Sequence, residues 1–140
     1  MSIRLIGPIV VLALALVTPL LADDLTGSDR FLCTSVQATQ CFADGECTTG
    51  PPWNWNVPQF IEVDLKAKTL STTEASGERR STPIKHAERA DGSVFLQGVE
   101  RGRAFSFAIV EETGMTSIAV AADGRAVAVF GACTPMPSGR

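Results

Sequence analysis

Apolar and polar residues alternate most regularly in residues 59–65. Ile61 and Val63 fall on one side of an extended chain, and Glu62 and Asp64 fall on the other. A period of two residues is typical of a β-strand with one buried face. Residues 70–74 and 81–89 are weaker strand candidates, and Pro83 predicts an edge or bulged position for the second because proline lacks an N–H.

The second half of the chain contains four runs rich in β-branched or aromatic residues, each too short for a typical helix. The runs cover residues 94–99, 104–110, 116–122 and 126–132. Glycine-containing turns precede or separate them, including Asp91-Gly92 and Asp123-Gly124, and Asp-Gly is a strong hairpin signal. Turns at this spacing predict an antiparallel meander.

Within these runs, one face carries large apolar residues and the other carries small ones. The first face holds Phe105, Phe107, Ile109, Ile118, Val120, Val127 and Val129, and the second is mostly alanine. This pattern suits a closed or nearly closed sheet whose outer side is partly covered. With residues 31–38 added, we predict an all-β domain of about eight strands, an up-and-down β-barrel; a β-sandwich is the alternative.

The chain has four cysteines, which allow three disulfide connectivities. Cys41 and Cys47 flank an Asp-Gly turn that brings their sulfur atoms together locally, which favours pairing Cys33 with Cys133. A Cys33–Cys133 bond joins the first predicted strand to the last, and its long loop stabilises the fold by ~4 kcal/mol in the chain-entropy model.

Metal and redox sites are the competing interpretation of the cysteines. No Cys-x-x-Cys pair is present, and His86 is the one histidine of the sequence. Zinc sites, thioredoxin-like motifs and covalent haem attachment all depend on such spacings. We therefore interpret the cysteines as structural disulfides and expect no metal and no cofactor.

Residues 1–22 have the pattern of a secretory signal peptide, with Arg4 near the start, an apolar run from Leu5 to Val17 and Ala22 at the cleavage point. A membrane anchor is the alternative, but Pro8 and Pro19 interrupt the run, and a spanning helix needs about 20 apolar residues. We expect cleavage to leave one domain, residues 23–140, in the periplasm or secreted, with no stable membrane anchor.

The mature chain is predicted to be mildly acidic. Its 12 basic residues less Arg4 leave 11, against 15 acidic residues, which gives a net charge of −4. Nucleic-acid binding needs a clustered basic face, so this class of partner is not expected. The two basic clusters, Arg79-Arg80 and Arg101 to Arg103, are interpreted as a solvated rim because they lie in polar, turn-like sequence.

Candidates for catalysis are few. His86 has charged neighbours typical of an exposed strand end, and the sequence contains no Gly-x-Ser-x-Gly or Ser-x-x-Lys motif. Glu62 and Asp64 share a strand face and are candidates for paired carboxylates or calcium ligands, but calcium takes six to eight oxygen atoms. We expect no catalytic residues; an enzyme that combines His86 with Glu62 or Asp64 is the least favoured alternative.

The segment with the most distinctive chemistry is residues 48–58, a proline-rich loop that holds both tryptophans. Trp53, Asn54, Trp55 and Asn56 are predicted to contact a ligand or partner, because indole stacks well and prolines limit the entropy cost of holding it in place. The alternative is that one or both indoles plug the end of the barrel.

Several segments resemble a group of small exported proteins of Gram-negative bacteria. They are residues 31–33, 58–65, 95–100, 102–107 and 129–134. The early cysteine, the late cysteine and the barrel between them are also loosely similar to the periplasmic inhibitors of C-type lysozyme. The serine- and lysine-bearing inhibitory loop of that family is not found, and Ser93, Ser106 and Lys85 are not assigned its roles.

These observations predict a non-catalytic exported binding module, which contacts a protein partner or a small apolar ligand through the Trp53/Trp55 loop or the barrel mouth. A structural component of the cell envelope is the alternative, followed by a hydrolase that uses His86.

Overall fold

The computed structural model describes residues 23–137, so the predicted signal peptide lies outside the described residues. Two short 3-10 helices, η1 (Pro52–Trp55) and η2 (Glu74–Ser76), accompany ten β-strands in this part of the chain. The strands are β1 (Arg30–Phe42), β2 (Cys47–Gly50), β3 (Phe60–Asp64), β4 (Thr69–Thr72), β5 (Ser81–Pro83), β6 (His86–Ala90), β7 (Ser93–Glu100), β8 (Arg103–Val110), β9 (Met115–Ala122) and β10 (Arg125–Pro135).

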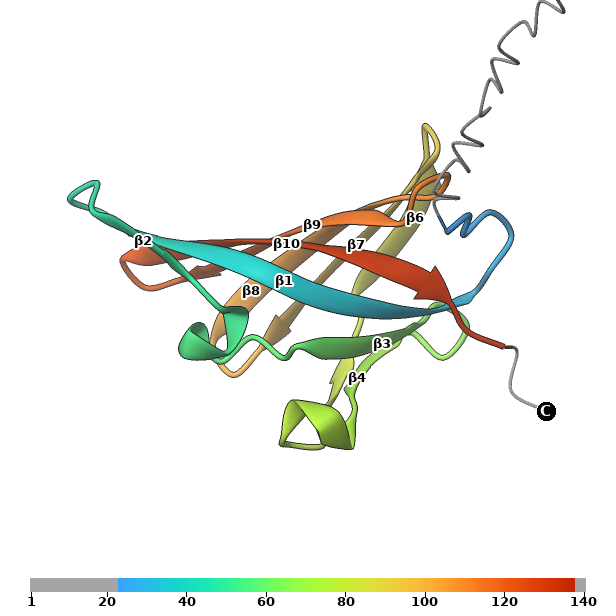
Figure 1. Cartoon of the computed structure of the whole chain (residues 1–140), viewed down its shortest axis with the longest axis horizontal. Helices are drawn as coiled ribbons and strands as arrows, with labels where there is room; N and C mark the ends of the chain where they lie inside the picture. Colours follow the sequence, from blue (N-terminus) through green and yellow to red (C-terminus); the bar gives the residue numbers. More distant parts are fainter. Residues whose placement is uncertain (1–22, 138–140) are drawn as a thin grey trace, which may run out of the picture.

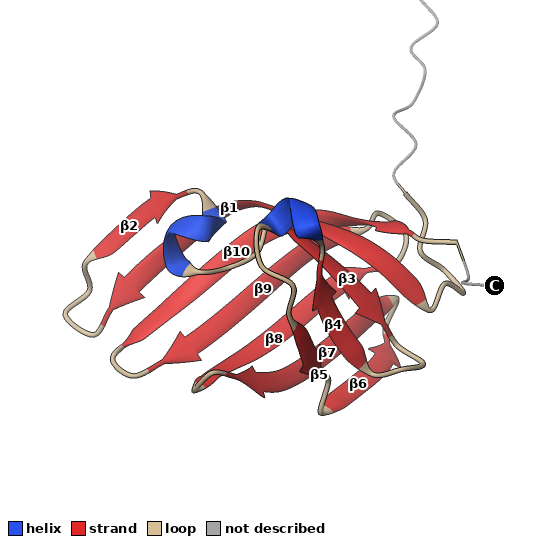
Figure 2. Cartoon of the chain, turned by 90° about the horizontal axis from the view of Figure 1, so that it is seen from below, coloured by secondary structure: helices blue, strands red, loops and turns tan. Residues whose placement is uncertain are grey.

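All ten strands belong to one antiparallel sheet with the order β5-β4-β3-β1-β10-β9-β8-β7-β6, and β2 pairs separately with β1. Neighbours in the sheet are consecutive in the chain except at β1, which pairs with both β3 and the last strand, β10. The sheet curls into a half-barrel (Figures 1 and 2). The structure therefore confirms the all-β meander, with ten strands instead of about eight, and a single sheet replaces the sandwich alternative.

The predicted strand over residues 81–89 is two strands, because the chain changes pairing partner at its centre. The Ile84 N–H donates to the carbonyl oxygen of Lys68, and the next N–H, from Lys85, donates to Gln97 on β7. β5 and β6 thereby become the two edges of the sheet. The two sides of the curled sheet therefore meet at this change of partner, because two consecutive N–H groups bind residues from opposite sides.

The concave face of the sheet holds the core. The large residues predicted for one face of the meander, Phe105, Phe107, Ile109, Ile118, Val120, Val127 and Val129, are all buried. Phe31, Leu96 and Val63 from β1, β7 and β3 complete the apolar interior. Burial of this one face contributes about 25 cal/mol per Å² of apolar surface and is the main contribution to the stability of the fold.

The convex face of β7 to β10 is uncharged and exposed. Solvent contacts Ala104, Ala121 and Ala126 on this face, and Phe130 is 52% exposed. The cover expected for this face is therefore absent from residues 23–137. Cross-strand neighbours here form three rows: Val99, Ala104, Ala121 and Ala126; Gln97, Ser106, Ala119 and Ala128; and Phe95, Ala108, Ser117 and Phe130.

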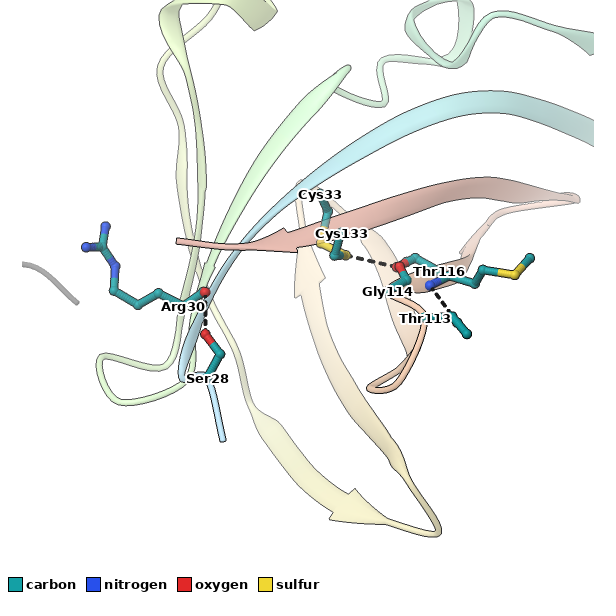
Figure 3. Close-up of a disulfide and its surroundings, with 8 residues drawn as sticks. Ser28, Arg30, Cys33, Thr113, Gly114, Thr116 and Cys133 are labelled. Atoms are coloured by element: carbon teal, nitrogen blue, oxygen red, sulfur yellow. Dashed lines mark hydrogen bonds between the residues drawn. A yellow bond between two sulfur atoms is a disulfide. The ribbon is translucent and has the colours of Figure 1, made fainter. Parts of the chain in front are cut away.

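Both predicted disulfides are present. Cys33 and Cys133 are direct neighbours on β1 and β10, so the bond reinforces the pairing of the first and last long strands (Figure 3). The hydroxyl oxygen of Thr116 on β9 lies 2.9 Å from Cys133 Sγ. Cys41 and Cys47 join β1 to β2, a strand that the sequence pattern does not predict. Two disulfides fit an oxidising compartment outside the cytosol.

Candidate functional site

An open groove of about 740 Å³ lies on the concave side, at the end of the half-barrel where the β7–β8 and β9–β10 hairpins turn. It is bounded by β1, η1 and the two hairpins, through Gln40, Asn54, Trp55, Asn56, Arg101, Gly102, Arg103, Val120, Ala122, Asp123, Arg125 and Val127. Its volume falls in the range of about 300–1,000 Å³ that is typical of small-molecule sites.

The wall formed by η1 is held in place by its own sequence and by one arginine. Pro52 occupies the first turn of η1, and Asn56 ends it in the left-handed region with φ 57°. Arg103 on β8 donates from Nη1 to the carbonyl oxygen of Trp55 at 3.1 Å and from Nη2 to that of Asn56 at 3.3 Å. These bonds tie the end of η1 to the sheet and fix the groove's width on this side.

The structure separates the two tryptophans. Trp55 is partly buried, packs against the core and lines the groove together with Asn54 and Asn56. Its ring lies so close to Gly50 that a Cβ there would be 3.3 Å from Trp55 Cη2. Trp53 is 56% exposed and lies outside the groove. Three of the four predicted contact residues therefore share one wall, and Trp53 does not belong to it.

We expect the two tryptophans to behave differently in solution. The Trp53→Phe variant, which keeps Trp55, should emit at shorter wavelength and be quenched less by acrylamide than Trp55→Phe. Because only Trp55 packs against the core, Trp55→Ala should cost about 2 kcal/mol of unfolding free energy and Trp53→Ala less than about 0.5 kcal/mol in urea denaturation. Equal costs would contradict this placement.

A smaller cavity of about 60 Å³ adjoins the groove and shares Asn56, Arg103 and Val120 with it. Most of its wall is apolar and comes from both halves of the half-barrel: Val57, Ile61, Leu70, Phe105, Phe107, Ile118 and Val120. Its polar lining includes Arg80, Thr82 and Glu100. The interior of the half-barrel is thus apolar with one charged side.

That charged side is the buried end of a chain of alternating arginines and glutamates, whose other end, Glu78 and Arg101, is exposed. Glu78 lies 2.7 Å from Arg101 and 4.0 Å from Arg80, and Glu100 lies 3.5 Å from Arg80 and 3.2 Å from Arg103. The hydrogen bond from Arg101 lowers the pKa of the Glu78 carboxyl, and Glu78 raises the pKa of Arg101. The Glu78–Arg101 pair therefore stays ionised to a lower pH than an isolated glutamate permits.

The interpretation of both basic clusters as a solvated rim is wrong for two residues. The side chains of Arg80 and Arg103 are only 8% and 16% exposed, whereas Arg79 is 75% exposed. Arg103 lies two residues before Phe105 on β8 and so shares its inward face. The backbone N–H of Arg80 donates to Thr72 Oγ1 at 2.7 Å, which fixes the position of the backbone from which the buried Arg80 side chain extends.

The structure gives the candidate catalytic residues other partners. His86 Nε2 lies 3.4 Å from Glu88 on the same strand, and both side chains are well exposed. Glu62 and Asp64 instead approach Arg30, at 3.9 and 3.6 Å. Within residues 23–137, no group of three or more histidine, cysteine, aspartate or glutamate residues is placed to hold a metal ion.

Comparison of the chain with protein-family models, with curated proteins and with solved structures finds no match. Of the helices in the described residues, none has the length and apolar character needed to cross a membrane.

Proposed function

We propose that this protein is a non-catalytic, exported binding module that holds a small apolar ligand in the hollow of the half-barrel, which is the groove and the adjoining cavity together. The observation that carries the proposal is that the two spaces adjoin: the groove beside Trp55 and the apolar cavity share the wall residues Asn56, Arg103 and Val120. Small-molecule sites typically combine apolar walls with a few polar groups that orient the ligand, and the apolar cavity beside the mainly polar groove offers both.

The groove wall suits this role because little has to be ordered on binding. Trp55 is fixed between Gly50 and the core, and Arg103 fixes the carbonyl groups at the end of η1. An indole that is already immobilised contacts a ligand without a further loss of rotamer entropy.

Two phenylalanine substitutions on adjacent residues of β9 test the proposal. Ala122 lines the groove, whereas Ala121 is exposed on the convex face. The probe is N-phenyl-1-naphthylamine, a neutral apolar amine whose fluorescence rises in an apolar site. We expect saturable binding to the wild type, a loss of about tenfold in affinity for Ala122→Phe, and no loss for Ala121→Phe, because only the first substitution puts a ring into the groove.

The proposal fails if the wild type shows no saturable binding, or if the two variants bind the probe equally well. Thermal unfolding of both variants serves as a control, since a fold loosened by either substitution would expose new apolar surface to the probe.

Export is part of the proposal, and it is supported by the two disulfides and by the pattern of residues 1–22. Mass spectrometry of protein secreted into an oxidising compartment should give the mass of residues 23–140 less four hydrogen atoms. A mass that includes residues 1–22 would contradict cleavage at this point.

A structural role in the cell envelope is the second candidate, and the uncharged convex face favours it. A protein that docks there desolvates no charge, which removes the largest cost of burying a surface. With photoreactive benzoylphenylalanine in place of Phe130, this role predicts a discrete cross-linked product that disappears when Ala119→Glu places a charge on the face. Cross-linking that is unchanged by Ala119→Glu would contradict it.

A further inference from the structure

Arg80 is a buried cation whose hydrogen-bonding capacity is only partly used. Its side chain is 8% exposed, and its Nε and Nη1 atoms have no hydrogen-bond partner among the described residues. Glu100 at 3.5 Å and Glu78 at 4.0 Å attract it by charge without completing these bonds. A buried donor without a partner retains the full cost of its lost hydration, so an acceptor supplied from outside would be strongly favoured here.

The charges around Arg80 do not balance. The alternating chain contains three guanidinium groups, from Arg80, Arg101 and Arg103, and two carboxylates, from Glu78 and Glu100, which leaves one positive charge in excess. The excess belongs to the largely buried members Arg80, Arg103 and Glu100, since the exposed pair Glu78–Arg101 is neutral, and the overall charge of the protein is −3. An anion that enters the cavity therefore meets a complementary site, and a neutral molecule leaves the charge uncompensated.

The position of Arg80 relative to the apolar wall defines the kind of anion. Arg80 lines the same cavity as Phe105, Phe107 and Ile118. A guanidinium group binds carboxylate, sulfonate and phosphate oxygen atoms through paired N–H donors. We propose that the ligand is amphipathic, with a singly charged anionic head on Arg80 and an apolar body along the cavity and groove.

This inference rests on the proposed function, since it names the chemistry of the ligand that the hollow holds. A purely structural role for Arg80 is the competing explanation, because the alternating chain joins the β4–β5 side to the β7–β8 hairpin. Glu100 is already held without Arg80, however: Thr82 donates to its Oε1 at 2.9 Å, and Arg103 donates to its Oε2 at 3.2 Å. Arg80 is thus not required to hold Glu100 in place.

Two fluorescent probes that share one aromatic amine skeleton distinguish binding of the anionic head from binding of the apolar body. N-phenyl-1-naphthylamine is neutral, and 1-anilinonaphthalene-8-sulfonate adds a single anionic group. Arg80→Gln removes the proposed partner of the head, and Arg79→Gln is the matched control, because Arg79 is 75% exposed and pairs only with Glu74 among the described residues. Both variants lose one positive charge.

We expect Arg80→Gln to bind the sulfonate about thirtyfold more weakly than the wild type, the effect of losing charge-assisted hydrogen bonds in a buried site. Binding of the neutral probe should change by less than about twofold, and Arg79→Gln should match the wild type with both probes. If Arg80→Gln does not fold, Arg80→Lys replaces it, with a smaller loss for the sulfonate alone, because lysine keeps the charge and lacks the paired donors.

The other outcomes separate the two proposals. If the neutral probe binds and the sulfonate is unaffected by Arg80→Gln, the inference fails and the proposed function stands. If Arg80→Gln weakens the binding of both probes equally and lowers the melting temperature, the role of Arg80 is purely structural and the inference fails. If neither probe binds the wild type, the proposed function fails and the inference fails with it.

Discussion

Replacing both Cys33 and Cys133 with alanine is expected to lower the free energy of unfolding by about 4 kcal/mol. The two residues are 100 positions apart, so their bond removes a large amount of conformational freedom from the unfolded chain. The bond also joins β1 to β10, the pairing that brings the first and last long strands together. Alanine is the suitable replacement because both cysteines are almost completely buried.

The second disulfide is a matched control in the same protein. Cys41 and Cys47 are only 6 positions apart, and the same entropy relation gives about 2 kcal/mol for their bond. Urea denaturation of the two double variants measures both values. Equal losses, or a larger loss for the Cys41–Cys47 pair, would contradict the view that the long loop stabilises this fold.

Gly131→Ala is expected to cost about 3 kcal/mol, at the upper end of the range for overpacking. A Cβ at residue 131 would lie 2.0 Å from the carbonyl oxygen of Thr34 and 3.2 Å from the Cα of Ser35. Both neighbours are backbone atoms of β1, so no side-chain rotation relieves the contact. The close approach occurs where the register of β1 and β10 shifts between Ser35 and Gln37, and bulges of this kind bend the strand.

Gly124→Ala provides the comparison for this prediction. Gly124 has φ +67° in the β9–β10 turn, and a Cβ there meets no atom within 4 Å. The substitution should cost only the backbone strain, about 1 kcal/mol. Thermal and urea unfolding should therefore rank Gly131→Ala well below Gly124→Ala in stability, and the reverse ranking would show that β1 and β10 do not approach as described.

The parts of the fold that the sequence predicts best are those in which each strand carries its own signal. β7 to β10 combine a period of two with glycine turns, and their inward residues, such as Phe107 and Val129, are buried as expected. β2 has no such signal, because Thr48 and Thr49 are both exposed and its place depends on pairing with β1. The division of residues 81–89 is not predictable for a similar reason: it depends on which distant strand each N–H binds.

The sequence predicts the candidate site in part. The proline-rich loop does contribute Asn54, Trp55 and Asn56 to the groove, but local sequence gives no reason for Trp53 to face away. Arg103 is predictable, because its parity with Phe105 places it on the inner face. Arg80 precedes the three-residue strand Ser81–Pro83, which has no alternation of apolar and polar residues, and its burial depends on distant residues such as Thr72 and Glu100.

The central claim is that the hollow beside Trp55 binds a small apolar molecule, and a titration followed by two-dimensional ¹H–¹⁵N NMR tests it most directly. The two indole N–H signals act as internal reporters, since Trp55 lines the groove and Trp53 does not. On addition of N-phenyl-1-naphthylamine, we expect saturable shifts of the Trp55 indole and of the Gln40 and Val120 amides, with Trp53 and Ala119 unchanged. Shifts confined to Trp53 or to the convex face, or no saturable shift at all, would contradict the claim.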